Sequence, residues 1–188
     1  MEYKNRIADK LLRDKLEAMG AVLIEGPKAC GKTTTAEQQA KSIIYMDDPV
    51  KQEQYKQMAQ TNIRFLLEGE TPRLIDEWQH VPQFWDAIRF EVDHRDDDGQ
   101  FMLTGSAVPA DMKEIHHTGT GRYGWLTMRP MSLWESGEST GEVSLSDLFL
   151  TPDRIGALNK LTLPMLAFAA CRGGGRVVVP NKKGKKGD

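Results

Sequence analysis

The stretch Gly26-Pro27-Lys28-Ala29-Cys30-Gly31-Lys32-Thr33 closely follows an apolar run over residues 21–24. It fits the pattern G-x-x-x-x-G-K-[ST] of a phosphate-binding loop. Glycines let the backbone fold tightly around an anion, so that amide N–H groups point at a phosphate. Lys32 is expected to reach the β- and γ-phosphates, and Thr33 to offer a hydroxyl to Mg²⁺. The stretch therefore predicts a nucleotide site.

The whole loop is predicted to contact the nucleotide. Cys30 lies inside it and is either a small filler or an oxidation-sensitive switch; we favour the filler. The predicted binding residues are Gly26, Pro27, Lys28, Ala29, Cys30, Gly31, Lys32, Thr33 and Thr34.

Short apolar runs alternate with amphipathic segments on both sides of the loop. Strands alternating with helices indicate an α/β fold with a parallel sheet that is covered on both faces. The predicted strands are 21–24, 42–46, 73–76, 101–104 and 123–128, and the predicted helices are 2–19, 32–41, 51–67 and 82–94.

The composition excludes several classes of protein. The chain has 188 residues, 39% hydrophobic and 28% charged, which is ordinary for a globular protein and argues against a disordered or fibrous one. A net charge of -2 argues against a polycation made for nucleic acid. Two cysteines are too few for a disulfide scaffold. Since no signal peptide or membrane-spanning run is visible, we expect a cytoplasmic protein.

Two adjacent acids end the third predicted strand, in Leu74-Ile75-Asp76-Glu77. Asp76 can hold the Mg²⁺ shell, and Glu77 can polarise the water that attacks the γ-phosphate. Consecutive strand residues point to opposite sides, which suits two separate tasks. A GTPase is disfavoured because Asn159-Lys160 lacks the Asp of a guanine-reading motif.

Further polar residues follow the fourth predicted strand. Thr104 or Ser106 is predicted to hydrogen-bond the γ-phosphate or the attacking water. Arg122 is a candidate arginine finger, acting on its own or a neighbouring subunit, and Arg129 is its rival. The pair His116-His117 is interpreted as a loop pair rather than a metal site, because no ligand stands at a suitable spacing.

Several motifs stand in the order found in one known family, the prokaryotic AAA-type ATP-binding proteins that normally carry an uncharacterised C-terminal domain. The chain resembles them over residues 3–160, most specifically in the stretch after the fifth predicted strand. The motifs are Ile24-Glu25-Gly26-Pro27-Lys28 with Cys30-Gly31-Lys32-Thr33-Thr34, Asp47-Asp48-Pro49, Leu74-Ile75-Asp76-Glu77-Trp78-Gln79, Leu103-Thr104-Gly105-Ser106 and Met128-Arg129-Pro130-Met131-Ser132-Leu133-Trp134-Glu135-Ser136.

The resemblance implies a P-loop NTPase of the AAA type, a three-layer sandwich with five parallel strands in the order 5-1-4-3-2. It implies ATP rather than GTP, and it places Tyr3 and Arg6 in a segment near the adenine. The roles that it carries over are Thr33 and Asp76 as Mg²⁺ contacts, Glu77 as water-activating base, Thr104 or Ser106 as sensor and Arg122 as finger.

The resemblance also implies an ATP-binding core with its N-terminal helix over 1–160 and the start of a C-terminal domain over 161–175. The content of Gly and Lys predicts a basic, disordered tail over 176–188. Because the family continues further, we expect the chain to be truncated. Its partners are then ATP, a second copy acting through a trans arginine finger, and DNA or a protein bound by the missing domain.

The sequence predicts Mg²⁺-dependent ATP hydrolysis by an ATPase core. The alternative is a nucleotide-gated switch or binding module without turnover, whose effector domain is lost. A small-molecule kinase ranks below both, because we find no arginine-rich lid and kinases seldom need a glutamate after the strand aspartate.

Overall fold

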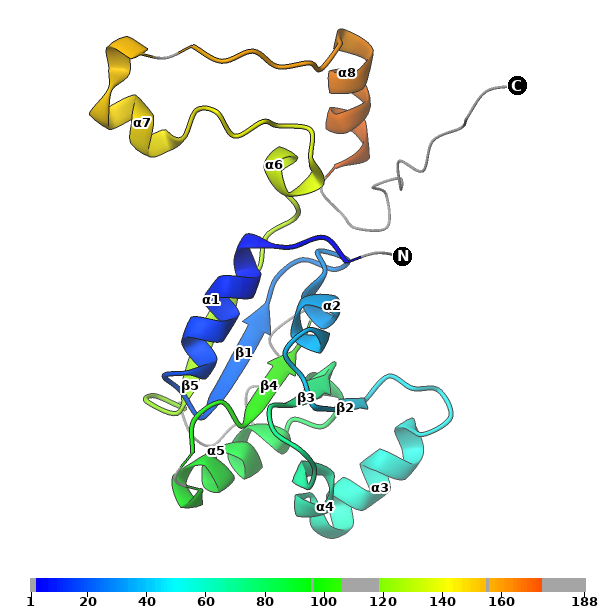
Figure 1. Cartoon of the computed structure of the whole chain (residues 1–188). Helices are drawn as coiled ribbons and strands as arrows, with labels where there is room; N and C mark the ends of the chain where they lie inside the picture. The colour runs from blue at the N-terminus through cyan, green and yellow to red at the C-terminus, as the bar shows by residue number, and fades with distance from the viewer. Residues whose placement is uncertain (1–2, 96, 106–118, 155, 174–188) are drawn as a thin grey trace. The chain divides into compact units, whose positions relative to one another are not determined.

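The computed structural model describes residues 3–95, 97–105, 119–154 and 156–173 (Figure 1). The chain divides into two compact units. The core unit is Ile7–Arg129, and the second unit combines Met1–Arg6 with Pro130–Asp188. Ser106, His116 and His117 lie outside the described residues, as does the predicted tail.

The core unit is built on one five-stranded sheet. All neighbouring strands are parallel, in the order β2-β3-β4-β1-β5. Read from the other edge this is 5-1-4-3-2, so the predicted sheet is confirmed. The strands are β1 (Ala21–Glu25), β2 (Ser42–Tyr45), β3 (Arg73–Asp76), β4 (Phe101–Thr104) and β5 (Tyr123–Thr127).

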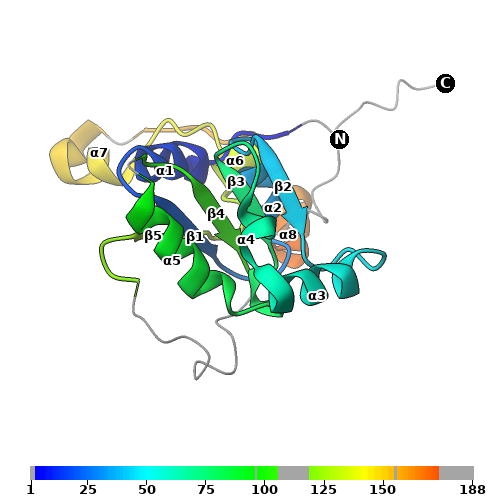
Figure 2. The same ribbon diagram turned by 90° about the horizontal axis from the view of Figure 1, so that it is seen from below.

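Helices cover both faces of the sheet, which makes the predicted three-layer sandwich (Figures 1 and 2). The helices α1 (Ile7–Leu16) and α2 (Lys32–Glu37) pack on one face. The opposite face carries α3 (Gln52–Asn62), α4 (Arg64–Leu67), the short 3₁₀ helix η1 (Trp78–His80) and α5 (Phe84–His94).

Alternation along the strands explains the two-sided burial. In β1, Ala21 and Leu23 pack toward α5, whereas Val22 and Ile24 pack toward α1. Because successive side chains of a strand point to opposite faces, a strand covered on both faces must be apolar throughout. This is why short continuous apolar runs located the strands.

One predicted helix ends early, and another is divided into two. The helix expected over 32–41 stops at Glu37, where Gln38 N–H donates to the carbonyl of Thr35 in a tighter turn. Lys41 N–H then donates to the carbonyl of Pro72 at 2.9 Å, directly before β2 pairs with β3. The helix expected over 51–67 is interrupted at Ile63.

In the part of the second unit that the structure describes, there are three short helices and a 3₁₀ turn. The unit also takes in residues 130–160, which the sequence analysis placed in the core. Side-chain caps start the helices: Ser132 and Ser144 form capping boxes, and the Thr162 hydroxyl accepts from Met165 N–H. The elements are α6 (Leu133–Ser136), α7 (Leu145–Leu150), η3 (Pro152–Arg154) and α8 (Leu163–Arg172). No described helix combines the length and apolar character that a membrane span requires.

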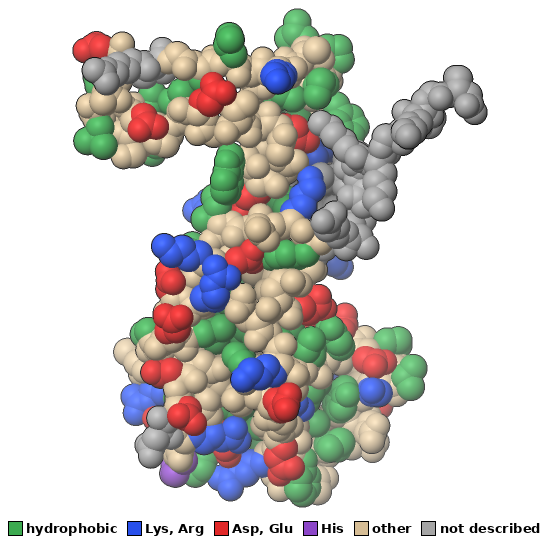
Figure 3. Space-filling model, in the orientation of Figure 1, with side chains coloured by type: hydrophobic (Ala, Val, Ile, Leu, Met, Phe, Trp, Pro, Cys, Tyr) green, Lys and Arg blue, Asp and Glu red, His purple; other side chains and the backbone are tan. Residues whose placement is uncertain are grey.

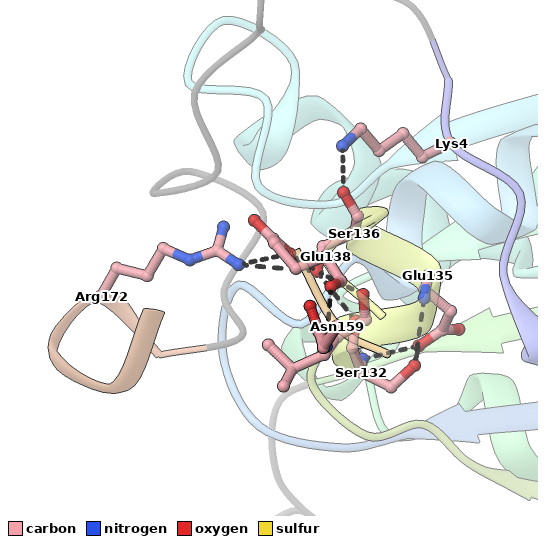
Figure 4. Close-up of polar contacts among 8 residues, drawn as sticks. Lys4, Ser132, Glu135, Ser136, Glu138, Asn159 and Arg172 are labelled. Carbon is pink, nitrogen blue, oxygen red and sulfur yellow. Dashed lines mark hydrogen bonds and ion pairs between the residues drawn. The ribbon is translucent and has the colours of Figure 1, made fainter. Parts of the chain in front are cut away.

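Polar contacts join the ends of the second unit (Figure 4). Arg172 pairs with Glu138 at 2.8 Å, and Lys4 Nζ donates to the carbonyl of Ser136 at 3.0 Å. Burial opposes ionisation of Glu138, but the hydrogen bond from Ser136 and the charges of Arg172 and Lys4 outweigh it and lower its pKa.

Arg6 also belongs to this second unit. Its side chain is 4% exposed and pairs with Glu135 at 2.9 Å, where the carboxylate is 5% exposed. Arg6 is therefore committed to a buried ion pair within its own unit, and its expected place near an adenine stays a prediction.

Candidate nucleotide site at the carboxyl edge of the sheet

The phosphate loop joins β1 to α2 through backbone that only certain residues adopt easily. Gly26 has φ 149° and Gly31 φ 101°. A side chain at Gly26 would collide with the carbonyl oxygen of Met128, which follows β5. Ala29 has φ 63°, a conformation that is uncommon outside glycine. Such backbone persists only where the surrounding structure enforces it, which is frequent at ligand sites.

The Lys32 side chain is hydrogen-bonded inside the loop. The side chain is largely buried, and Nζ donates to the carbonyl oxygens of Gly26 at 2.9 Å and of Pro27 at 3.0 Å. An ammonium is costly to bury unless it is hydrogen-bonded, and these two carbonyls supply the bonds. The loop thus holds a cation against its own backbone, where an anionic phosphate can replace the carbonyls as partner.

Asp76 is the node at which three elements of the core unit meet. Its Oδ1 accepts a hydrogen bond from Thr33 Oγ1 of α2 at 2.7 Å and another from Thr104 Oγ1 of β4. Asp76 and Thr104 are paired in register as the last residues of β3 and β4. The sheet therefore brings together three residues that the sequence analysis had assigned to one site.

Burial and nearby negative charges disfavour the ionised form of the Asp76 carboxyl group. Burial raises the pKa of Asp76 above its usual value. The hydrogen bonds from Thr104 and Thr33 act in the opposite direction, while the nearby charges of Glu77 and Asp47 add to the rise. A divalent cation beside this carboxylate would relieve the same imbalance.

The backbone of Glu77 is not extended, so the alternation of side chains along β3 does not set the direction of its side chain. It lies one residue beyond β3 in the left-handed region, with φ 52° and ψ 45°, and is half-buried. Its Oε2 accepts a hydrogen bond from Gln79 Nε2. The direction of Glu77 is therefore set by this turn and by Gln79, not by the two-residue period of a strand.

The two candidate arginines lie at opposite ends of β5. Arg122 precedes the strand, and its Nε pairs with Asp93 at 2.7 Å. Because the loop follows the carboxyl end of the parallel strand β1, this position is remote from the phosphate loop of the same chain. Arg129 follows β5 on the loop side, next to Met128, and is exposed. The choice between them stays a prediction.

Two neighbours of the site carried no predicted role. Tyr45 of β2 is in register with Asp76 and donates to Glu37 Oε1 at 2.8 Å; burial and the Glu37 carboxylate raise the pKa of Tyr45 to about 12. Gln79 appeared only as part of a motif. Neither role could be found from spacing, because each depends on a contact between elements.

Cys30 is 1% exposed, and its Sγ lies 3.8 Å from the carbonyl oxygen of Met128. That packing suits the predicted filler role, because the thiol closes the space between the loop and the end of β5. Among the described residues, no group of three or more His, Cys, Asp or Glu side chains forms a metal-binding cluster.

The fold and this edge define a class of protein. The loop follows β1, the two acids stand at the end of β3, and β4 with its terminal threonine lies between these two strands. Phosphate loop, acid-bearing strand and intervening polar strand together characterise a P-loop nucleoside triphosphate-binding core.

Comparison with known proteins gives the family. Residues 19–136 match the family model described as "AAA domain", which is more than half of the chain. The chain therefore belongs to the AAA domain family and contains an AAA-type, ATP-binding P-loop core. No curated protein matches it.

Two solved structures are similar in part. The Walker-type ATPase PABY2304 of Pyrococcus abyssi has a TM-score of 0.43 and 13% identity, over 71% of this chain and 56% of that one. PCH-2 of C. elegans has a TM-score of 0.38 and 16% identity, over 68% of this chain and 42% of that one. The chain thus spans about half the length of the solved structures that it matches.

Proposed function

We propose that this chain binds ATP with Mg²⁺ in the loop Gly26–Thr34 and hydrolyses it to ADP and phosphate. The observation that carries the proposal is the junction at Asp76, whose carboxylate accepts hydrogen bonds from Thr33 and Thr104 beside the loop that holds Lys32. A purely structural glycine turn would not need a buried carboxylate, a threonine hydroxyl and a buried ammonium at one edge of a sheet.

The donor set fits a magnesium ion. Thr33 Oγ1 and Asp76 Oδ1 lie 2.7 Å apart, and both are the hard oxygen donors that Mg²⁺ prefers. Mg²⁺ usually takes one or two protein oxygens and completes its shell with phosphates and water, so a pair of ligands is sufficient. When bound, the ion would neutralise charge on the β- and γ-phosphates.

The chain's own residues supply the remaining tasks. Lys32 exchanges its backbone carbonyl partners for phosphate oxygens and stabilises charge that develops during transfer. Thr104 reaches the same edge and contacts the γ-phosphate or the water. Glu77 accepts a proton from the attacking water and orients it. Ser106 is a rival of Thr104 as the sensor.

An arginine finger would act between copies of the chain. Arg122 is about half exposed, is paired with Asp93 and lies at the opposite edge from its own loop, so a role as finger requires the nucleotide of a neighbouring copy. We propose self-association through this residue, with Arg129 as the alternative finger. A DNA or protein partner would belong to a further domain.

The test measures ATP binding and phosphate release with Mg²⁺ at several protein concentrations, for wild type and for Lys32→Ala and Glu77→Gln. We expect Lys32→Ala to lose binding, and Glu77→Gln to bind ATP normally while phosphate release falls at least about 100-fold. Release that rises faster than protein concentration would support the trans finger.

Other outcomes select the alternative. Tight ATP binding by the wild type without release would favour a nucleotide-gated switch. Equal release by wild type and Glu77→Gln would contradict the assignment of the base. Unchanged binding by Lys32→Ala would contradict the site itself.

A further inference from the structure

Gln79 lies two residues beyond the proposed base and is joined to it. Its Nε2 donates a hydrogen bond to Oε2 of Glu77. The two residues share one tight turn, in which Glu77 is the N-cap of η1 and its carbonyl accepts from His80 N–H at 3.1 Å. The left-handed backbone of Glu77 brings both side chains to the same place.

The amide oxygen of Gln79 is enclosed by packing against Gly105. Its Oε1 is buried and has no hydrogen-bond partner among the described residues. The same oxygen lies where Gly105 passes, since a Cβ on Gly105 would stand 2.5 Å from it and 3.2 Å from the Trp78 indole nitrogen. Gly105 directly follows Thr104, so the amide lies between the proposed base and the end of the sensor strand.

A buried amide oxygen without a hydrogen-bond partner destabilises the folded state. A glutamine that served only to fill this space could be replaced by an apolar side chain of the same shape at no such cost. Retaining the amide is explained if its N–H group has a task toward Glu77. The only described hydrogen bond of its side chain is the one to that carboxylate.

We propose that Gln79 is a positioning residue that holds the Glu77 carboxylate in the orientation from which it acts on the attacking water. The inference rests on the proposed function. A carboxylate on a half-buried side chain can rotate about several bonds. One fixed oxygen removes most of that freedom and leaves the direction of the second oxygen defined. The amide is neutral, so it orients the carboxylate without adding a competing charge.

The position of Gly105 adds a connection to the sensor strand. A shift at the end of β4 moves the backbone against which the amide packs, and the amide is bonded to the base. Gln79 thus links the residue that contacts the γ-phosphate, Thr104, to the residue that activates the water, Glu77.

The experiment compares Gln79→Met with Gln79→Asn in the full chain, using MgATP. Methionine has nearly the same length without the donor, and asparagine keeps the amide but draws it back by one methylene. His80→Ala is the matched control, because His80 is exposed on the same turn. We expect kcat to fall about 10- to 100-fold in both Gln79 variants, with KM and the Kd for ATP unchanged within about twofold.

A double-mutant cycle separates positioning from a general structural role. In a Glu77→Gln background, Gln79→Met is expected to cause no further loss of kcat, because its effect passes through the base. A parallel loss of ATP binding and melting temperature in the Gln79 variants would indicate a structural role and overturn the inference. Turnover by the wild type with unchanged kcat in both Gln79 variants would overturn the inference alone, whereas absence of turnover in the wild type would overturn the proposed function as well.

Discussion

In the core unit the strands bury large apolar side chains on both faces, whereas α6, α7 and α8 of the second unit have no buried residue. Phe101 of β4 is 0% exposed, but Phe149 of α7 is 79% exposed. Figure 3 shows apolar side chains on the surface of the second unit over α7 and α8.

The two units therefore depend on different interactions. The core is stabilised by burial of apolar surface, at about 25 cal/mol per Å². The second unit relies on side-chain caps and on ion pairs such as Arg6–Glu135, which fix local geometry but contribute little net stability. The candidate nucleotide site lies in the core unit, where the buried sheet gives it a rigid support.

The largest expected effect comes from a cavity in the core. Phe101→Ala should destabilise the core by about 3–5 kcal/mol, because a fully buried ring between the sheet and α5 is lost. The matched variant Phe149→Ala should change stability by less than about 0.5 kcal/mol. Urea unfolding measures both, and similar losses in the two variants would contradict the contrast between the units.

A smaller effect is expected from the nucleotide. At a free MgATP concentration about 100 times Kd, in the Glu77→Gln variant to prevent turnover, binding should stabilise the core by about 2.7 kcal/mol. Hydrogen exchange should slow in β1, β3 and β4 and stay unchanged in α7. Equal protection of α7 would show that the second unit takes part in binding.

The smallest effect is expected at Asp76, a buried carboxylate of the core unit whose burial disfavours the ionised form. Burial raises the folded-state pKa of Asp76, so the penalty for its ionised form is absent below the unfolded value of about 3.9 and is complete above the folded-state pKa. Asp76→Asn should therefore stabilise the protein at pH 7, by less than either of the two effects above. The gain should disappear as the pH falls toward 4.

Thermal unfolding of both proteins across that pH range measures this effect, and Asp93→Asn serves as a control at a carboxylate whose pKa is instead lowered by Arg122. A variant Asp76→Asn that is less stable than wild type at pH 7 would mean that the carboxylate stabilises the junction with Thr33 and Thr104. The same variant is expected to lose the Mg²⁺ dependence of ATP binding.

Strands were predicted more closely than helices, for a physical reason. β3 and β4 begin and end at the predicted residues, because each contains a short apolar run, Leu74-Ile75 or Phe101-Met102-Leu103, next to polar or turn-forming residues. The helix after the loop was predicted too long, since its end depends on the bond from Lys41 N–H to Pro72 and not on its own sequence.

The site shows the same division. Lys32 and Thr33 follow from the loop motif, because a phosphate cradle needs a fixed local spacing. The bond from Thr104 to Asp76 requires the register between β3 and β4, which spacing along the chain does not contain. The remote position of Arg122 follows from the direction of β5.

The class of fold, the phosphate loop and the acids at the end of the third strand can be predicted from the amino-acid sequence, because apolar periodicity and glycine backbone freedom are local properties. The junction at Asp76, the turn that directs Glu77 and the contact of Gln79 with Gly105 are visible only in the folded chain. These depend on strand register and packing between distant segments, since hydrogen bonds and van der Waals contacts act over a few ångströms in space regardless of separation along the chain.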